Sequence, residues 1–168
     1  MATQDTDQSA DQLFFQADEL IKQQKIAEAK ETLERAVAVD PTHGRSYNHL
    51  GWIYDTKYRD YVQADAQFKR ALEFAPEYPA VYLNYAIVLS ALERYDDLEH
   101  LLIKAESVPG IAKDRVYNEQ GLLKEDQGKY DEAIEKFKLC VAKAKSLQDI
   151  ESYKENIERC KVKKATLA

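Results

Sequence analysis

The sequence predicts an all-α fold made of one helix pair repeated four times, and three observations support this class. A pattern of tyrosine, small and aromatic residues returns every 34 or 35 residues. Inside each period the apolar residues have helical rather than strand spacing. Five glycines and four prolines among 168 residues leave few breaks, which favours long helices over many short strands.

The period is clearest in the second half of each unit. Segments 54–76 and 124–146 place a tyrosine, a small residue and an aromatic residue at almost the same spacing. The columns are Ile26, Tyr61, Tyr95 and Tyr130; Ala29, Ala64, Leu98 and Ala133; Leu33, Phe68, Leu102 and Phe137; and Ala36, Ala71, Ala105 and Cys140. Because several independent columns keep one period, we interpret them as four copies of one unit.

Each unit contains two helical patterns separated by a turn. In the second unit, residues 43–57 and 61–75 each place their apolar residues on one helix face. Pro76 ends the second pattern, because proline cannot continue the hydrogen-bond ladder of a helix.

Small residues in the first helical pattern allow the two helices to approach closely. They form the column Ala17, Gly51, Ala86 and Gly121. We expect Gly51 to face Ala64 or Ala71 of the second helix. The second unit also has one extra residue within 56–60, which we expect to lengthen the turn between its helices.

The unit resembles the tetratricopeptide repeat, a 34-residue helix–turn–helix with the pattern W-x2-L-G-x2-Y, then A-x3-F-x2-A and a proline. The second unit reads Y-N-H-L-G-W-I-Y over 47–54 and A-D-A-Q-F-K-R-A over 64–71, followed by Pro76. The resemblance implies a right-handed superhelical α-solenoid of antiparallel helix pairs. It also implies a single domain over 9–168, with units at about 10–43, 44–78, 79–113 and 114–147.

Some places depart from the repeat pattern or lie outside it. The fourth unit has Gln120 and Lys124 where the pattern is apolar, which suggests looser packing there. A helix over about 148–165 is expected to cap the last unit, because a terminal repeat otherwise exposes an apolar face. In a rarer alternative, this helix folds into the groove or docks on a second copy. Residues 1–8 are polar and are expected to be disordered.

Composition disfavours several classes of function. The formal charge of −6 argues against a surface that binds the phosphates of a nucleic acid, so we expect no nucleic-acid partner. No apolar run is long enough for a membrane helix, and the first residues lack the parts of a signal peptide, so we expect a cytoplasmic protein without membrane insertion. Cys140 and Cys160 form no CxxC pair and are interpreted as reduced, buried thiols. A local basic cluster is interpreted as a solvated helix end: Arg159, Lys161, Lys163 and Lys164.

No arrangement of residues indicates catalysis. His43, His49 and His100 lack metal-ligand spacing, and no glycine-rich phosphate loop occurs. No serine, threonine or cysteine has a recognisable base partner. We therefore predict no enzyme activity, no metal and no cofactor.

The resemblance implies a peptide-binding groove lined by the first helix of each unit. Its predicted residues are Phe14, Asp18, Arg45, Asn48, His49, Trp52, Asp55, Leu83, Asn84, Ile87, Arg115, Asn118 and Leu122. Phe14, Trp52 and Ile87 are the predicted apolar anchors. Trp52 ranks first, because an exposed indole is costly unless a partner covers it.

Polar side chains also recur on this face. The amides and the cation predicted to contact a peptide are Asn48, Asn84, Asn118 and Arg115. Leu83 and Leu122 have a second interpretation, packing between neighbouring first helices.

Some proteins of the resembled family bind acidic chaperone tails with a carboxylate clamp of Lys, Asn, Asn, Lys and Arg. The clamp places hold Phe14, Asp18, His49, Ala80 and Asn84 in one alignment, and Asn48, Trp52, Asn84, Arg115 and Glu119 in another. Neither set is complete, so we expect an apolar or amphipathic partner segment.

We therefore predict a non-catalytic adaptor that binds a peptide or an amphipathic helix of another protein in the groove. Two alternatives from other classes stay open. A secretion-type chaperone or co-chaperone would hold one specific client, and co-purification with an aggregation-prone protein would favour it. A self-assembling scaffold would fill its groove with its own terminal helix or with a second copy in a homodimer, which light scattering with and without residues 148–168 would detect.

Overall fold

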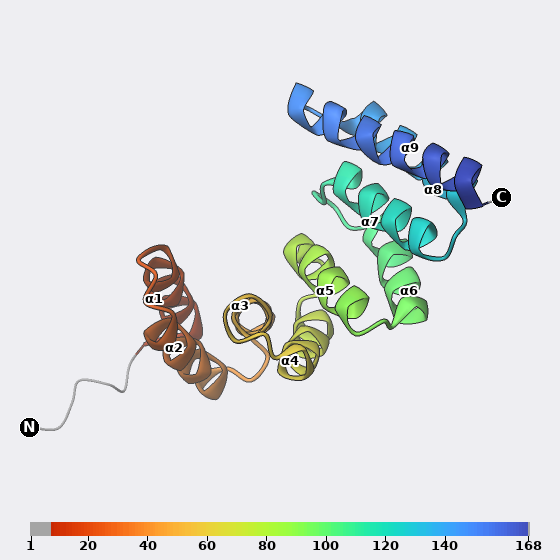
Figure 1. Cartoon of the computed structure of the whole chain (residues 1–168). Helices are drawn as coiled ribbons and strands as arrows, with labels where there is room; N and C mark the ends of the chain where they lie inside the picture. Colours follow the sequence, from red (N-terminus) through yellow and green to blue (C-terminus); the bar gives the residue numbers. More distant parts are fainter. Residues whose placement is uncertain (1–7, 168) are drawn as a thin grey trace, which may run out of the picture. The chain divides into compact units, whose positions relative to one another are not determined.

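The computed structural model describes residues 8–167. These residues form nine α-helices and one π-helical turn and no strand (Figure 1), so the described chain is all-α, as predicted. Disorder was expected for residues 1–8. Of these, residues 1–7 lie outside the described range. The chain divides into two compact units, Met1–Leu92 and Glu93–Ala168.

The first unit, within its described residues, consists of five α-helices that pack in chain order. They are α1 Ala10–Lys22, α2 Ile26–Val39, α3 Gly44–Ile53, α4 Tyr61–Phe74 and α5 Pro79–Ala91, with the π-helical turn η1 at Tyr54–Tyr58. Each helix packs on the next one, and α5 also contacts α3 (Figure 1). The pairs α1–α2 and α3–α4 are thus the first two predicted repeats, and α1, α3 and α5 are first helices.

The second unit, as far as it is described, consists of four helices. They are α6 Tyr95–Ala105, α7 Lys113–Asp126, α8 Tyr130–Lys143 and α9 Leu147–Leu167. α7 and α8 form a helix pair, α6 packs on α7, and α9 packs along α8. Tyr153 and Cys160 of α9 are buried in one cluster with Phe137 and Cys140 of α8. The terminal helix therefore covers the apolar face of the last pair, which is the role expected of it.

Each first helix ends in the same way. A residue just past its last turn has a positive φ: Gln24 (62°), Arg59 (56°), Glu93 (56°) and Gly128 (71°). A left-handed residue at this place reverses the chain and lets its N–H reach one of the last carbonyl groups of the helix. The N–H of Gln24 donates to the carbonyl of Ile21 at 2.9 Å. Only Gly128 among the four is the residue type that adopts this conformation without steric cost.

The extra residue of the second repeat does not lengthen the turn, contrary to expectation. It lies in the π-helical turn Tyr54–Tyr58, which continues α3. A π turn closes its hydrogen bond one residue later than an α turn, so it accommodates one extra residue inside the helix. Asp60 then caps α4, because its carboxylate accepts the N–H of Gln63 at 3.0 Å.

Gly51 faces a phenylalanine ring, and not the alanines that the sequence suggested. A Cβ atom added to Gly51 would lie 2.8 Å from Cε1 of Phe68, and one added to Gly121 would lie 2.6 Å from Cε1 of Phe137. Both rings are fully buried. The column of small residues does bring the two helices together, but its partner on the second helix is the aromatic column.

A repeated hydrogen bond ties two first helices to the loop before them. The hydroxyl of Tyr47 donates to the carbonyl of Pro41 at 3.1 Å, and that of Tyr82 donates to Pro76 at 2.7 Å. Both tyrosines are buried, and a buried phenol needs such an acceptor. The bond holds the loop that follows each second helix.

Gly51→Ala is expected to lower the free energy of unfolding by about 1–3 kcal/mol, because the added methyl group overlaps the ring of Phe68. Urea denaturation followed by circular dichroism measures this change. Val62→Ala, at an exposed position of α4, is the control and should leave the midpoint nearly unchanged. Combined with Phe68→Leu, Gly51→Ala should cost less than it does alone; additive effects would show that the ring is not the obstacle.

Candidate functional site

A pocket of about 240 Å³ opens on the first unit among its three first helices α1, α3 and α5. It is lined by Ile21, Asn48, His49, Trp52, Tyr78, Ala80 and Asn84. Four predicted groove residues thus lie together: Asn48, His49, Trp52 and Asn84. Tyr78, absent from the predicted site, is the N-cap of α5; an aromatic residue directly before Pro79 was the signal that could have indicated it.

Trp52 is half-buried at the wall of this pocket. The ammonium of Lys57 lies 5.2 Å from the centroid of its indole, a distance at which a cation is attracted to an aromatic ring. Thr56 donates its hydroxyl to the carbonyl of Trp52 at 2.8 Å. The π-helical turn therefore places a cation beside the tryptophan.

Asparagine side chains connect two of the first helices, α3 and α7, to a helix packed beside each. Asn84 of α5 donates its amide to Oδ1 of Asn48 on α3 at 3.2 Å, and in the second unit Asn156 of α9 donates to Asn118 of α7 at 3.1 Å. Asn48 is only 2% exposed. Its amide therefore serves the contact between α3 and α5, and Asn84 is the more accessible amide of the pocket.

His49 connects α3 to α1. Its Nε2 lies 3.7 Å from Oδ1 of Asp18, and its ring meets the ring of Phe14 edge-on at 4.7 Å between centroids. Burial lowers the pKa of His49, in spite of the nearby Asp18 carboxylate. A hydrogen bond from Lys22 lowers the pKa of Asp18. At neutral pH, His49 is thus an uncharged part of the pocket wall.

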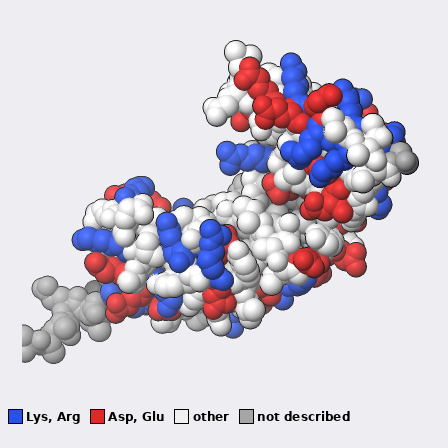
Figure 2. Space-filling view, in the orientation of Figure 1, with Lys and Arg blue, Asp and Glu red and all other residues white. Residues whose placement is uncertain are grey.

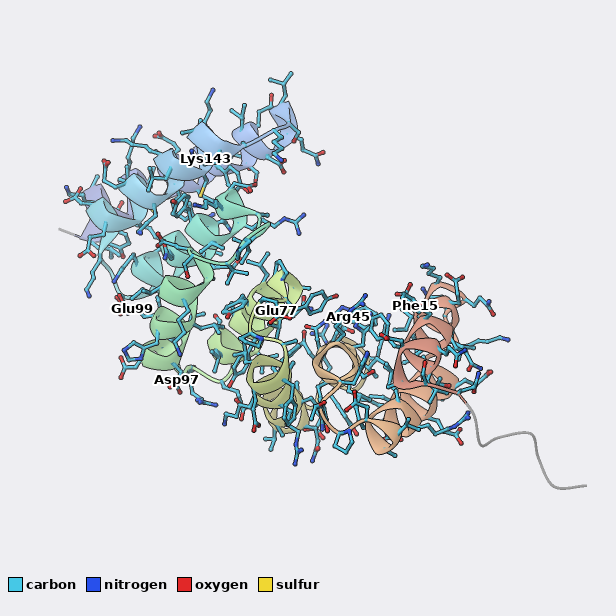
Figure 3. The ribbon with its side chains drawn as sticks, turned by 180° about the vertical axis from the view of Figure 1, so that it is seen from behind. Phe15, Arg45, Glu77, Asp97, Glu99 and Lys143 are labelled. Carbon is cyan, nitrogen blue, oxygen red and sulfur yellow. The ribbon has the colours of Figure 1, made fainter. Side chains whose placement is uncertain are left out.

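Phe14 does not project as an anchor, because other side chains cover it. It is 3% exposed, and the guanidinium carbon of Arg45 lies 4.4 Å from its centroid. Its neighbour Phe15, which the sequence did not single out, is 56% exposed. Figure 3 labels Phe15 on α1 and Arg45 on α3, on the same side of the two helices.

The remaining predicted residues of the first unit lie outside the pocket. Asp55 is 6% exposed, and burial raises the pKa of its carboxyl group. Leu83 is half-buried on α5. Ile87, a predicted anchor, is 53% exposed on the same helix.

In the second unit, α9 engages the face of α7 on which the remaining site residues were predicted. Besides the bond to Asn118, Tyr153 donates its hydroxyl to Oδ2 of Asp114 at 3.0 Å. Leu122 packs against the buried cluster that α8 and α9 form. Arg115 is exposed.

Glu125 forms the strongest ionic contact between α7 and α9. Its side chain is 3% exposed, and Arg159 donates Nε to Oε1 at 2.7 Å and Nη2 to Oε2 at 2.6 Å. Lys163 lies 2.8 Å from Oε1. These contacts, Arg159 above all, hold the pKa of Glu125 at about 2.

The basic cluster near the C-terminus is neutralised by acids. In addition to the Glu125 pairs, Lys164 contacts Asp131 and Lys161 contacts Glu158. On the face that Figure 2 shows, basic and acidic side chains alternate and do not form one large patch of a single sign.

Residues 8–167 give no sign of a metal or membrane site. They contain no group of three His, Cys, Asp or Glu side chains that could hold a metal ion. None of their helices is both long and apolar enough to span a bilayer.

Burial raises the pKa of Cys140 to about 12 and that of Cys160 to about 11, so both thiols stay protonated at neutral pH.

Two family models described as "Tetratricopeptide repeat" match the chain, over residues 16–79 and 114–142. Together the two matches cover more than half of its 168 residues. The chain belongs to the tetratricopeptide repeat family. No curated protein sequence matches it.

Solved tetratricopeptide structures share the fold at low sequence identity. The structure of pilF from Pseudomonas aeruginosa matches with a TM-score of 0.80 and 20% identity, over 94% of this chain and 69% of that one. The protein TTC0263 from Thermus thermophilus matches with 0.70 and 21%, over 89% and 82%. YrrB matches with 0.71 and 21%, over 90% and 81%.

The two polar departures from the tetratricopeptide pattern meet in a second pocket. It measures about 200 Å³ and is lined by Glu99, Ile103, Glu106, Gln120, Leu123, Lys124 and Lys136. Lys124 pairs with Glu99 at 2.7 Å, and Gln120 donates its amide to Glu106 at 2.6 Å. Gln120 is 6% exposed, and its Oε1 has no protein partner within the described chain.

Gln120→Leu, which restores the leucine of the tetratricopeptide pattern, is expected to raise the free energy of unfolding by about 1 kcal/mol. It removes a buried acceptor without a protein donor, while Glu106 is exposed enough to regain water. Urea denaturation measures the change, with Gln127→Leu at an exposed position near the end of the same helix as control. A loss of stability would show that the hydrogen bond from Gln120 to Glu106 outweighs the cost of the buried acceptor.

Glu125→Gln is expected to destabilise the protein by about 2 kcal/mol at pH 7, because the neutral amide loses the ionic fork to Arg159. The pKa of Glu125 is about 2 in the fold, against the ordinary value of 4.5 that applies to the unfolded chain. The contribution of the carboxylate is therefore complete above pH 4.5 and is lost as the pH falls toward 2. The difference between the urea midpoints of the two proteins should shrink steadily as the pH falls from 5 to 3; a constant difference would contradict this origin.

Proposed function

We propose that the protein is a non-catalytic interaction module that binds an extended segment of a partner protein at the pocket of its first unit. The observation that carries this proposal is the grouping of Trp52, Tyr78 and Asn84 around one opening. Large aromatic side chains at a concave surface contribute much of the energy of protein binding. An amide beside them can bond the backbone of an extended chain.

The size of the pocket supports a peptide side chain as its occupant. At about 240 Å³ it is smaller than most pockets for whole small molecules. An apolar side chain of the partner would insert beside the indole of Trp52. Asn84 would then donate to or accept from the main chain next to the inserted residue.

Known relatives of the fold are consistent with this role. YrrB, similar in fold to this chain, is described as a tetratricopeptide protein with an unusual peptide-binding site. Its identity of 21% supports the shared fold alone, so the peptide site of the present chain rests on its own pocket.

The second unit contributes less to the proposed surface. Asn118 and Leu122 are engaged by α9 or by the core, which leaves Arg115 exposed. A chaperone for one client, a self-assembling scaffold, a homodimer and a cytoplasmic location stay predictions of the sequence.

Trp52→Ala is expected to weaken peptide binding at least tenfold, because the anchor of the pocket is lost. Peptides are first selected from a random display library on the wild-type protein. Calorimetry then compares the wild type, Trp52→Ala and the control Val62→Ala, which alters an exposed residue of α4. Equal affinity of all three proteins would remove the pocket from the proposal, and a library without binders would remove peptide binding itself.

A further inference from the structure

Arg45 lies among three aromatic rings at the edge of this pocket. Its guanidinium carbon is 4.4 Å from the centroid of Phe14, 5.8 Å from Phe15 and 5.7 Å from Tyr78. The rings come from α1 and from the cap of α5, while Arg45 belongs to the first turn of α3 (Figure 3). The cation is therefore held in position by apolar surfaces on several sides.

No carboxylate within residues 8–167 pairs with this cation, and its Nε is buried without an acceptor. The acids of α1 already have other partners. Asp11 lies 3.1 Å from His43, and Asp18 lies 3.0 Å from Lys22. His49, one turn further along α3 than Arg45, lies 3.7 Å from the same Asp18.

The guanidinium of Arg45 contacts aromatic rings but has no anion beside it in the part of the chain that the structure describes. A guanidinium has five N–H donors in a plane that matches a carboxylate. Its attraction to an anion grows where rings exclude water. The same chain completes such a contact elsewhere, because Arg159 grips Glu125 with two parallel bonds.

We propose that Arg45 binds an acidic side chain of the partner segment whose apolar residue enters the pocket at Trp52. This inference rests on the proposed function and adds the charge of the partner to it. An Asp or Glu side chain suits the site better than a chain terminus, because its methylene stem can lie on the exposed ring of Phe15. Arg45 stands at none of the clamp places considered in either alignment above.

The geometry of α3 also sets the spacing of the partner's two residues. Arg45 precedes Trp52 by seven residues, which corresponds to about 10 Å along the helix axis. An extended peptide advances about 3.3 Å per residue. Side chains that share a face of an extended chain are an even number of positions apart, so the acidic and the apolar residue of the partner are two or four positions apart.

The test uses peptides selected from a random library on the full-length wild-type protein, each made with a free and with an amidated C-terminus. We expect an Asp or Glu two or four positions from an apolar residue, and the same affinity for both termini. Replacing that acid by Gln or Asn should weaken binding at least tenfold in the wild type. In Arg45→Met the same replacement should have no effect, because its partner is gone.

Arg70→Met is the matched control. The guanidinium carbon of Arg70 lies 5.6 Å from the ring of Tyr47, but the residue belongs to α4 and lies outside the pocket. Arg70→Met should keep the wild-type response to the acid. Should Arg45→Met fail to fold by circular dichroism, Arg45→Lys replaces it, since it keeps the charge but not the planar fork, and should reduce the effect of the acid severalfold.

The outcomes separate this inference from the proposed function. Peptides that depend on Trp52 but show no acidic preference, or keep that preference in Arg45→Met, overturn the role of Arg45 and leave the pocket intact. Binding that requires a free C-terminus overturns the assignment to a side chain. A library without binders overturns both proposals.

Discussion

The contact on which the helix pairs α3–α4 and α7–α8 depend is that between a glycine of the first helix and a phenylalanine ring of the second. Gly51 with Phe68 and Gly121 with Phe137 leave less than 3 Å to the place of a Cβ atom. This contact sets the distance between the two helices, because the buried ring has no room to move. A left-handed residue recurs at the repeat period in the turns that follow α1, α3, α5 and α7, and it reverses the chain whether or not the pair has a glycine–phenylalanine contact.

Much of the fold follows from the sequence, because the repeat period and helical spacing identify which residues share a face. They do not identify which column of the second helix faces a given column of the first. Gly51 was therefore expected to face alanines, although the ring of Phe68 fills the space beside it. The extra residue near Thr56 was assigned to the turn, since periodicity alone cannot register a shift of hydrogen bonds into a π turn. At the site, four of the pocket residues were predicted from the first helix of the repeat. The burial of Phe14 was not predicted, because the residue that covers it, Arg45, lies 31 positions further along the chain.

The same face of a first helix serves two purposes in this chain. On α7 this face binds α9, through the ion pair of Glu125 with Arg159 and through the bond between Asn118 and Asn156. On α3 it is shared between α5, through Asn48 and Asn84, and an open pocket. This face of a first helix is accessible only where the helix packed beside it leaves it uncovered, so accessibility follows from packing between helices and not from residue type alone.

Arg159 and Arg45 lie in opposite environments, and the proposal assigns stability to the first and recognition to the second. Arg159 meets a carboxylate of its own chain, and the closed pair fixes the terminal helix. Arg45 meets aromatic rings, which orient its guanidinium but leave its Nε without an acceptor. A cation that is oriented in advance loses little freedom when an anion arrives, and so more of the interaction appears as affinity. This arrangement explains why two aromatic residues, Phe14 and Phe15, are adjacent on α1: their rings hold the guanidinium at the pocket edge in a fixed direction.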